Sequence, residues 1–241
     1  MNSIILAAGK GSRIPQISLN KPKCLINLNG TSILSRQIAY HKKSKIKKII
    51  IVRGHKKNHI KFRSVIYVEN KNYRNNEQLA SLLSAKKYLN DNLIITFSDI
   101  IYDFKILSKI VKDKKRDIVL GVDPSWKKKY KFRYDHPYDQ ADKVCYNKNK
   151  QITGIGKKLS FNKTKAEFIG IIKLSKEGCK IFKNNLNFMS KKKIDKMQIH
   201  EYLSFLIKKK IKIYPCIIKG KFMEIDTYND LKIAKKMFQK V

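Results

Sequence analysis

Residues 6–13 read Leu6-Ala7-Ala8-Gly9-Lys10-Gly11-Ser12-Arg13 and directly follow a short apolar run, Ser3–Leu6. Such a run predicts a buried strand, so this stretch becomes a loop of small residues at the carboxyl end of that strand. Small residues let backbone N–H groups approach a base or a phosphate closely, and Arg13 adds a fork of hydrogen-bond donors. The stretch therefore predicts a loop that binds a nucleotide or a phosphate.

Two widespread phosphate-binding motifs do not fit this loop. A P-loop would need a glycine where Ile4 stands, and Ser or Thr where Gly11 follows Lys10. The dinucleotide-binding pattern G-x-G-x-x-G begins correctly at Gly9 and Gly11 but meets Ile14 at its third position. The loop is thus of another kind, closed by an arginine.

Apolar runs alternate with helical patterns in the first half of the chain, which predicts βαβ units and a largely parallel sheet. The expected strands are Ser3–Leu6, Lys48–Val52, Ser64–Glu69, Leu93–Phe97 and Asp117–Val122. The expected helices are Ser32–Lys43 with Thr31 as its N-cap, Gln78–Leu89 and Phe104–Lys112.

The pattern of apolar and polar residues changes after Val122. Asp123–Gln140 is polar and aromatic, and such a long excursion within an α/β domain is usually functional. The elements expected after it are strands at Lys143–Asn147, Gln151–Ile155 and Phe168–Leu174, helices at Lys176–Lys183 and Lys196–Lys208, a strand at Ile211–Ile218 and a closing helix at Tyr228–Gln239. The sequence predicts one α/β domain with a small inserted β region.

Length and composition exclude several classes of protein. The chain has 241 residues, of which 42% are hydrophobic, so it can bury a sizeable core. No apolar run approaches the roughly 20 residues that span a bilayer, and the N-terminal apolar run is too short for a signal peptide, so we expect a soluble, cytoplasmic protein. The four cysteines, Cys24, Cys145, Cys179 and Cys216, have no metal-ligand spacing, which argues against structural zinc.

The formal net charge is +37, from 55 Lys and Arg against 18 Asp and Glu. A strongly basic chain can bind nucleic acid, but these lysines are scattered and no basic stripe interleaved with aromatic residues emerges. We therefore do not expect a nucleic-acid partner, although sequence alone leaves open whether the charge is functional or compositional. A positive field would in either case attract phosphorylated small molecules.

A second basic segment, Lys21-Pro22-Lys23-Cys24-Leu25-Ile26, follows the glycine-rich loop. Together the two segments resemble the nucleotidyltransferase family that activates sugar phosphates, choline phosphate and related acceptors. The other interpretation is a glycine turn followed by surface lysines. The resemblance implies a GT-A-type fold, that is, a Rossmann-like three-layer α/β/α arrangement with a mostly parallel central sheet. It also implies a single domain over 1–241, with a nucleotide-binding half at 1–122 and an acceptor-binding half at 123–241.

The resemblance extends to two aspartates that would hold Mg²⁺. Asp99 follows the expected strand Leu93–Phe97, although Ser98 stands where the family usually has glycine. Asp226 lies in a Glu-Ile-Asp-Thr segment similar to that of the family. The carboxyl ends of strands converge in open α/β sheets, and Mg²⁺ suits one or two carboxylates with substrate phosphates. Asp226 could instead cap the helix that follows it.

Further site residues are implied by the same resemblance. Arg13 and Lys23 would be catalytic, stabilising the triphosphate and the leaving pyrophosphate. The nucleotide would be bound by Leu6, Ala7, Ala8, Gly9, Gly11, Gln78 and Ser81. The acceptor would be bound by Asp123, Trp126, Arg133, Lys157, Glu167 and Glu224. Two points stay open, namely whether Lys157 or Lys158 contacts phosphate, and whether Trp126 merely packs the inserted region.

The region after Asp123 resembles the cytidylyltransferase branch that uses choline phosphate and aminoalkylphosphonates. We therefore expect a Mg²⁺-dependent enzyme in which an acceptor phosphate or phosphonate attacks the α-phosphorus of CTP. Choline phosphate and 2-aminoethylphosphonate are the acceptors that the resemblance favours. A sugar 1-phosphate acceptor, another NTP, and a non-catalytic protein that binds nucleotides or nucleic acid are the alternatives. The sequence leaves a monomer and a homodimer both open.

Overall fold

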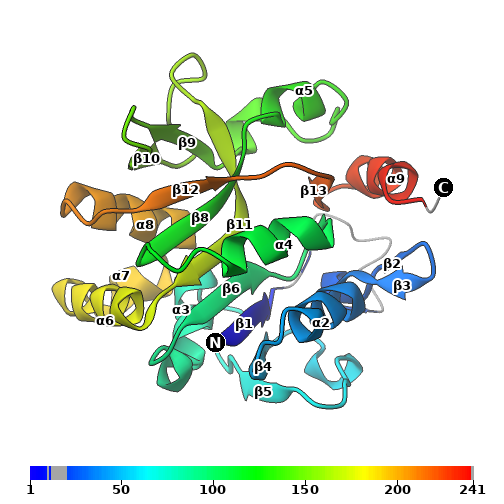
Figure 1. Ribbon diagram of the computed structural model, residues 1–241. Helices are drawn as coiled ribbons and strands as arrows, with labels where there is room; N and C mark the ends of the chain where they lie inside the picture. Colours follow the sequence, from blue (N-terminus) through cyan, green and yellow to red (C-terminus); the bar gives the residue numbers. More distant parts are fainter. Residues whose placement is uncertain (10, 12–20, 240–241) are drawn as a thin grey trace.

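A mixed sheet of nine strands forms the centre of the molecule within residues 1–9, 11 and 21–239, which are the residues that this computed structural model describes (Figure 1). Its strands in chain order are β1 (Asn2–Ala7), β4 (Lys48–Arg53), β5 (Ile66–Glu69), β6 (Leu93–Phe97), β8 (Ile118–Asp123), β9 (Lys143–Tyr146), β10 (Ile152–Ile155), β11 (Ala166–Leu174) and β12 (Tyr214–Ile217). The spatial order is β10-β9-β11-β6-β1-β4-β5, with β8 paired to β11 and β12 paired to β8.

The parallel core of this sheet consists of β6, β1, β4 and β5. These strands are rich in isoleucine and nearly continuous in apolar residues, because helices cover both faces of a parallel sheet. On one face α2 (Ile33–Lys43) and α4 (Phe104–Val111) lie side by side, and the ring centroids of Tyr40 and Phe104 are 5.6 Å apart. On the other face lie α3 (Gln78–Ser84), α7 (Lys191–Asp195) and α8 (Ile199–Lys208) (Figure 1).

Beyond β6 the sheet becomes mixed, because β11 runs antiparallel to β6, β8 and β9. The chain can reverse there since it passes through the long inserted segment between β8 and β11. Gly170, with a φ of +72°, lies at an irregularity of the pairing between β11 and β8, and a side chain at that position would meet the ring of Phe97. The predicted α/β class, with a sheet that has a parallel core, is confirmed.

Several short elements were not predicted. They are the hairpin strands β2 (Asn27–Leu28) and β3 (Thr31–Ser32), the paired strands β7 (Ile100–Tyr102) and β13 (Phe222–Glu224), α5 (Trp126–Tyr130), α7, and the 3₁₀ turns Lys23–Leu25, Lys57–His59, Tyr138–Gln140 and Asn185–Phe188. Their runs of two to five residues are too short to show a period. The pairing of β13 with β7 matters most, because it brings a distant segment beside the end of β6.

The remaining predicted elements form with shifted ends. The helices are α6 (Lys176–Asn184), α8 and α9 (Tyr228–Met237), and the expected helix Gln78–Leu89 divides into α3 and a 3₁₀ turn. The predicted N-cap of α2 at Thr31 is wrong. Ser32 caps the helix, since its side chain accepts a hydrogen bond from Ser35 N at 3.1 Å, while Thr31 pairs in the β2–β3 hairpin.

Candidate active site

A cleft of about 390 Å³ opens at the carboxyl ends of β1 and β6. This volume is in the range of small-molecule sites. Thirteen of the predicted site residues line it, namely Leu6, Ala7, Ala8, Gly9, Gly11, Lys23, Gln78, Ser81, Asp99, Lys157, Glu167, Glu224 and Asp226. Because β1 and β6 are parallel neighbours, the loops that follow them meet at one edge of the sheet.

The loop after β1 forms one wall of the cleft. Gly11 has a φ of +64°, and a Cβ at this position would lie 2.9 Å from Lys23 Cβ. Only glycine fits there without displacing Lys23. Gly9 has no such neighbour, since a Cβ at position 9 would meet nothing within 4 Å among the described residues. Arg13, the second predicted catalytic cation, lies outside the residues that the structure describes.

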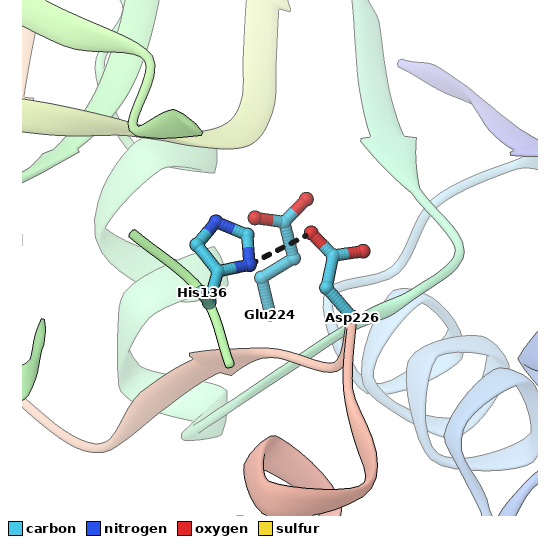
Figure 2. Close-up of side chains that lie close together, drawn as sticks. All are labelled: His136, Glu224 and Asp226. Atoms are coloured by element: carbon cyan, nitrogen blue, oxygen red, sulfur yellow. Dashed lines mark ion pairs between the residues drawn. The ribbon is translucent and has the colours of Figure 1, made fainter. Parts of the chain in front are cut away.

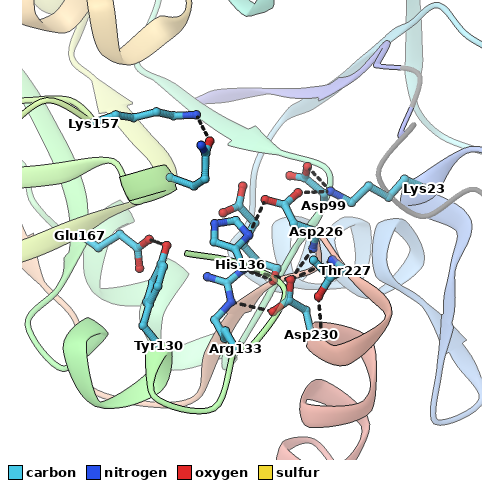
Figure 3. A network of polar contacts seen from close by, with 12 residues as sticks. Lys23, Asp99, Tyr130, Arg133, His136, Lys157, Glu167, Asp226, Thr227 and Asp230 are labelled. Atoms are coloured by element: carbon cyan, nitrogen blue, oxygen red, sulfur yellow. Dashed lines mark hydrogen bonds and ion pairs between the residues drawn. The ribbon is translucent and has the colours of Figure 1, made fainter. Parts of the chain in front are cut away.

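Lys23 lies at the start of a 3₁₀ turn, Lys23–Leu25, and its ammonium bridges the two predicted metal ligands (Figure 3). Lys23 Nζ lies 2.9 Å from Asp99 Oδ2 and 2.6 Å from Asp226 Oδ1. Burial of the ammonium would lower its pKa, but the charges of Asp99 and Asp226 outweigh that effect and raise the pKa of Lys23 above its ordinary value. Lys23 is therefore a fixed cation at the bottom of the cleft.

Asp226 and Glu224 reach the cleft from β13 and the residues that follow it. Ile225 N donates to Asp99 O at 2.9 Å, which joins the segment to the end of β6. His136, Glu224 and Asp226 offer ligand atoms that lie within 4.8 Å of one another, and His136 Nδ1 is 3.5 Å from Asp226 Oδ2 (Figure 2). Burial, together with the charges of Asp226 and Asp99, raises the pKa of Glu224 well above its ordinary value.

These acidic side chains fit a divalent cation. Three carboxyl groups, from Asp99, Glu224 and Asp226, line one cleft beside the ammonium of Lys23. Oxygen ligands of this kind suit Mg²⁺. Burial, together with the charges of Asp226 and Asp99, raises the pKa of Glu224, and a divalent charge nearby would favour its ionised form. The alternative role for Asp226 as a helix cap does not hold, because Thr227 and Asp230 form the capping box of α9.

The opposite wall of the cleft comes from the start of α3 and carries Gln78 and Ser81. Gln78 Oε1 accepts a hydrogen bond from Ile199 N at 3.3 Å, which ties α3 to α8 and leaves the amide nitrogen of Gln78 as a donor. Ser81 Oγ accepts from Asn70 Nδ2 at 2.8 Å. Tyr73 and Asn76 also line this wall, and nothing in their local sequence distinguishes them.

Glu167 and Lys157 mark the side of the cleft formed by the second half of the chain. Tyr130 Oη donates to Glu167 Oε1 at 2.5 Å, and burial raises the pKa of Glu167 from 4.5 to about 7. Lys157 Nζ donates to Gln140 Oε1 at 3.1 Å (Figure 3). Lys157 lines both the cleft and a neighbouring hollow, and Lys158 lines that hollow.

Three of the residues predicted to bind the acceptor are not among those that line the cleft. Trp126 is 1% exposed and packs with Tyr130 and Ala141, as in the alternative in which it packs the inserted region. The carboxylate of Asp123 is buried and paired with Lys129. Arg133 is buried and paired with Asp230. Their burial depends on contacts between distant segments, which the local sequence does not show.

Sequence reasoning also missed several polar residues of the cleft. Asp142 Oδ1 lies 3.1 Å from His200 Nδ1, and both residues line the cleft together with Gln140 and Gln198. Asp142 directly precedes β9, and Gln198 is the N-cap of α8. Their position beside the end of a predicted strand or helix is the sequence feature that could have identified them.

Comparisons with known proteins agree with this architecture. Residues 3–153 match the family described as MobA-like NTP transferase domain. A CTP:phosphoglutamine cytidylyltransferase from Campylobacter jejuni is 28% identical, over 97% of this chain and 98% of that protein. A choline-phosphate cytidylyltransferase from Haemophilus influenzae is 32% identical over 39% of this chain and 42% of its own. The structure of the inositol-1-phosphate CTP transferase from T. maritima superposes with a TM-score of 0.77 at 17% identity, covering 100% of this chain and 97% of that one.

Within the described part of the chain, no helix combines the length and the apolar character needed to cross a membrane.

Proposed function

The chain belongs to the MobA-like NTP transferase domain family and is a nucleotidyltransferase, and we propose that it transfers CMP from CTP to the phosphate or phosphonate of a small acceptor. The observation that carries this proposal is the placement of Lys23 between Asp99 and Asp226, at the bottom of a cleft whose wall is the loop after β1. Phosphoryl transfer commonly uses a cationic side chain together with a metal ion that acidic side chains hold.

The reaction needs alignment and charge neutralisation more than acid–base chemistry. An oxygen of the acceptor phosphate attacks the α-phosphorus of CTP. The bond from the α-phosphorus to the oxygen that bridges it to the β-phosphorus breaks, and the electron pair leaves with pyrophosphate. Because the attacking oxygen is already anionic at neutral pH, no general base is required. Lys23, with Arg13 as the second predicted cation, would stabilise the negative charge on the triphosphate and on the leaving pyrophosphate.

We propose that Asp99 and Asp226 hold Mg²⁺, with Glu224 close enough to share in binding it. When bound, the ion would neutralise phosphate charge and polarise the phosphorus–oxygen bonds. Lys23 lies between the two aspartates and keeps their carboxylates together. Its ammonium would also attract the phosphates of the nucleotide.

The choice of CTP is supported by the names of two relatives and by the chemistry of the α3 wall. The relatives from C. jejuni and H. influenzae are both cytidylyltransferases. Gln78 carries an amide that can hydrogen-bond a pyrimidine edge, and Ser81 lies one turn further along α3. We propose that residues 1–122 bind the nucleotide and that residues 123–241 bind the acceptor.

For the acceptor we propose a compound that carries an amino or ammonium group, with choline phosphate and 2-aminoethylphosphonate as predicted. Glu167 and Asp142 line the cleft from the second half of the chain, and their carboxyl groups would suit a positively charged group of the acceptor. The relative from C. jejuni, which covers 97% of this chain, is named for phosphoglutamine, so we add this compound to the proposed acceptors. The buried Trp126 gives no support to an aromatic cage built on it.

Pyrophosphate release with Mg²⁺ tests the proposal. Each of the four NTPs is combined with phosphoglutamine, choline phosphate, 2-aminoethylphosphonate and a set of sugar 1-phosphates. We expect release with CTP and an amino-bearing acceptor. Release only with a sugar 1-phosphate would keep the reaction and overturn the acceptor. Absence of release with every pair, in a protein that still binds CTP, would favour a non-catalytic nucleotide-binding protein.

A further inference from the structure

One buried ion pair, between Arg133 and Asp230, supports the segment that carries the acidic ligands into the cleft (Figure 3). Arg133 Nε donates to Asp230 Oδ1 at 2.6 Å, and Arg133 Nη2 donates to Asp230 Oδ2 at 3.0 Å. Arg133 is 4% exposed and Asp230 is 0% exposed. This two-point geometry uses the planar fork that arginine has and lysine lacks.

The pair also holds the backbone of residues 224–227 at both ends. Arg133 Nη2 donates to the carbonyl oxygen of Glu224 at 3.3 Å. Asp230 Oδ2 accepts from Asp226 N at 3.0 Å and from Thr227 N at 2.9 Å. A single pair of side chains thus contacts the backbone on both sides of Glu224 and Asp226, in addition to the pairing of β13 with β7 and the hydrogen bond from Ile225 N to Asp99 O.

We propose that Arg133 and Asp230 are positioning residues that hold Asp226, and with it Glu224, in the arrangement that binds the divalent cation. This inference rests on the metal role proposed for Asp226. Groups that orient metal ligands commonly change metal affinity by about 10- to 100-fold when they are removed. Arg133 therefore acts through the ligand segment and does not contact the acceptor, contrary to the expectation from sequence.

The contacts of Arg133 go beyond what the fold of α9 needs. The helix start is secured by its own capping box, in which Thr227 Oγ1 accepts from Asp230 N at 3.1 Å. The inserted segment is joined to the same helix independently, because Asn229 Nδ2 donates to Phe132 O at 2.8 Å. Since Arg133 comes from the inserted segment, its hydrogen bond to Glu224 O also ties that segment to the proposed metal ligands.

The test measures the binding of Mn²⁺, which serves as a probe for Mg²⁺. Binding is followed by the rise in Tm that Mn²⁺ causes in the protein without nucleotide. A ligand that binds only the folded state raises Tm to an extent set by its affinity and concentration, so a Mn²⁺ titration gives an apparent Kd. Asp226→Asn establishes whether the rise reports this site. If that variant keeps the full rise, the metal role in the proposed function fails, and the failure is separate from that of the present inference.

Arg133→Met is the decisive variant and Lys129→Met is its matched control. Both leave one buried carboxylate without its cation, Asp230 in the first case and Asp123 in the second. Both also remove a hydrogen bond to the backbone of β13, at Glu224 O in the first case and at Phe222 O in the second. We expect both to lower the Tm without metal, but only Arg133→Met to weaken Mn²⁺ binding at least about tenfold. Equal Mn²⁺ affinity in Arg133→Met and the wild type would overturn the inference.

Arg133→Lys covers the case in which Arg133→Met does not fold. An ammonium can pair with Asp230 but cannot donate to both of its oxygens and to Glu224 O in the same plane. We expect this variant to recover most of the lost stability while its Mn²⁺ affinity stays below that of the wild type. If its stability and its Mn²⁺ affinity recover together, the pair has a purely structural role and the inference is wrong.

Discussion

At the scale of single residues, the contact between Gly11 and Lys23 decides how the cleft is built. Any side chain at position 11 would have to take a φ of +64° and would meet Lys23 Cβ at 2.9 Å. The glycine at position 11 therefore has a second role besides letting a phosphate approach the loop. It leaves the space in which the ammonium of Lys23 reaches Asp99 and Asp226.

Gly11→Ala tests this arrangement in the free protein. We expect the free energy of unfolding to fall by about 1–2 kcal/mol, because a left-handed backbone strains any residue with a Cβ. Gly9→Ala is the matched control, since its backbone lacks a positive φ and nothing lies within 4 Å of the new Cβ among the described residues. Urea unfolding of both variants makes the measurement. An equal effect of the two substitutions would contradict the packing of Gly11 against Lys23.

Glu167 gives a prediction for pH. Burial raises its pKa from 4.5 to about 7, so the folded state binds a proton that the unfolded state has lost. The neutral form of Glu167 therefore contributes fully to the free energy of unfolding below pH 4.5. This contribution is lost as the pH rises from 4.5 through about 7, and a pKa shift of this size corresponds to a loss of about 3 kcal/mol.

The variant Glu167→Gln isolates this contribution, because its amide oxygen can still accept from the hydroxyl of Tyr130. We expect the difference in unfolding free energy between the variant and the wild type to change between pH 4.5 and 8, in favour of the variant at high pH. Urea unfolding across this range checks the prediction. A difference that stays constant with pH would mean that Glu167 titrates normally.

At the scale of elements, the start of α2 separates what the sequence pattern predicts from what it does not. The pattern locates the helix to within a residue but gives its cap to Thr31. Thr31 and Ser32 both pair in the β2–β3 hairpin, and Ser32, the last residue before the helix, accepts the hydrogen bond from Ser35 N. A hairpin with two-residue strands leaves no periodic signal, so the shift of the cap by one residue could not be seen.

Replacing each residue by alanine distinguishes the two caps. Ser32→Ala removes the acceptor for Ser35 N and should lower the free energy of unfolding by about 1 kcal/mol. Thr31→Ala alters an exposed side chain and should change it by less than about 0.5 kcal/mol. Thermal unfolding followed by circular dichroism makes the comparison. A larger loss at Thr31 would restore the cap that the sequence predicted.

At the scale of the whole molecule, the sequence predicted the parallel core and the three side chains at its edge. Strands of continuous isoleucine and valine can be recognised by pattern, and Lys23, Asp99 and Asp226 lie in short segments with a recognisable order. The placement of Asp226 beside Asp99 depends on the pairing of β13 with β7. That pairing involves only three residues on each strand, and motif resemblance supplied what periodicity could not.

The inserted region shows where prediction from sequence ends. Trp126, Asp123 and Arg133 were predicted as acceptor contacts because that stretch resembles the cytidylyltransferase branch of the family. In the structure all three side chains are buried. Trp126 lies in a small aromatic core, and Asp123 and Arg133 each form a buried ion pair. Local sequence cannot distinguish a buried ion pair from a binding residue, because both need the same residue types, and only the distant partner decides between them.

The most direct test of nucleotidyl transfer in this cleft is ³¹P NMR of the reaction with CTP, Mg²⁺ and an amino-bearing acceptor. The account predicts a new phosphoanhydride signal from CMP joined to the acceptor, with pyrophosphate formed in equal amount. Lys23→Ala should slow both at least about 100-fold, on the scale of one lost electrostatic donor, whereas the exposed Lys21→Ala should not. Pyrophosphate without the joined product, or an unchanged rate in Lys23→Ala, would contradict it.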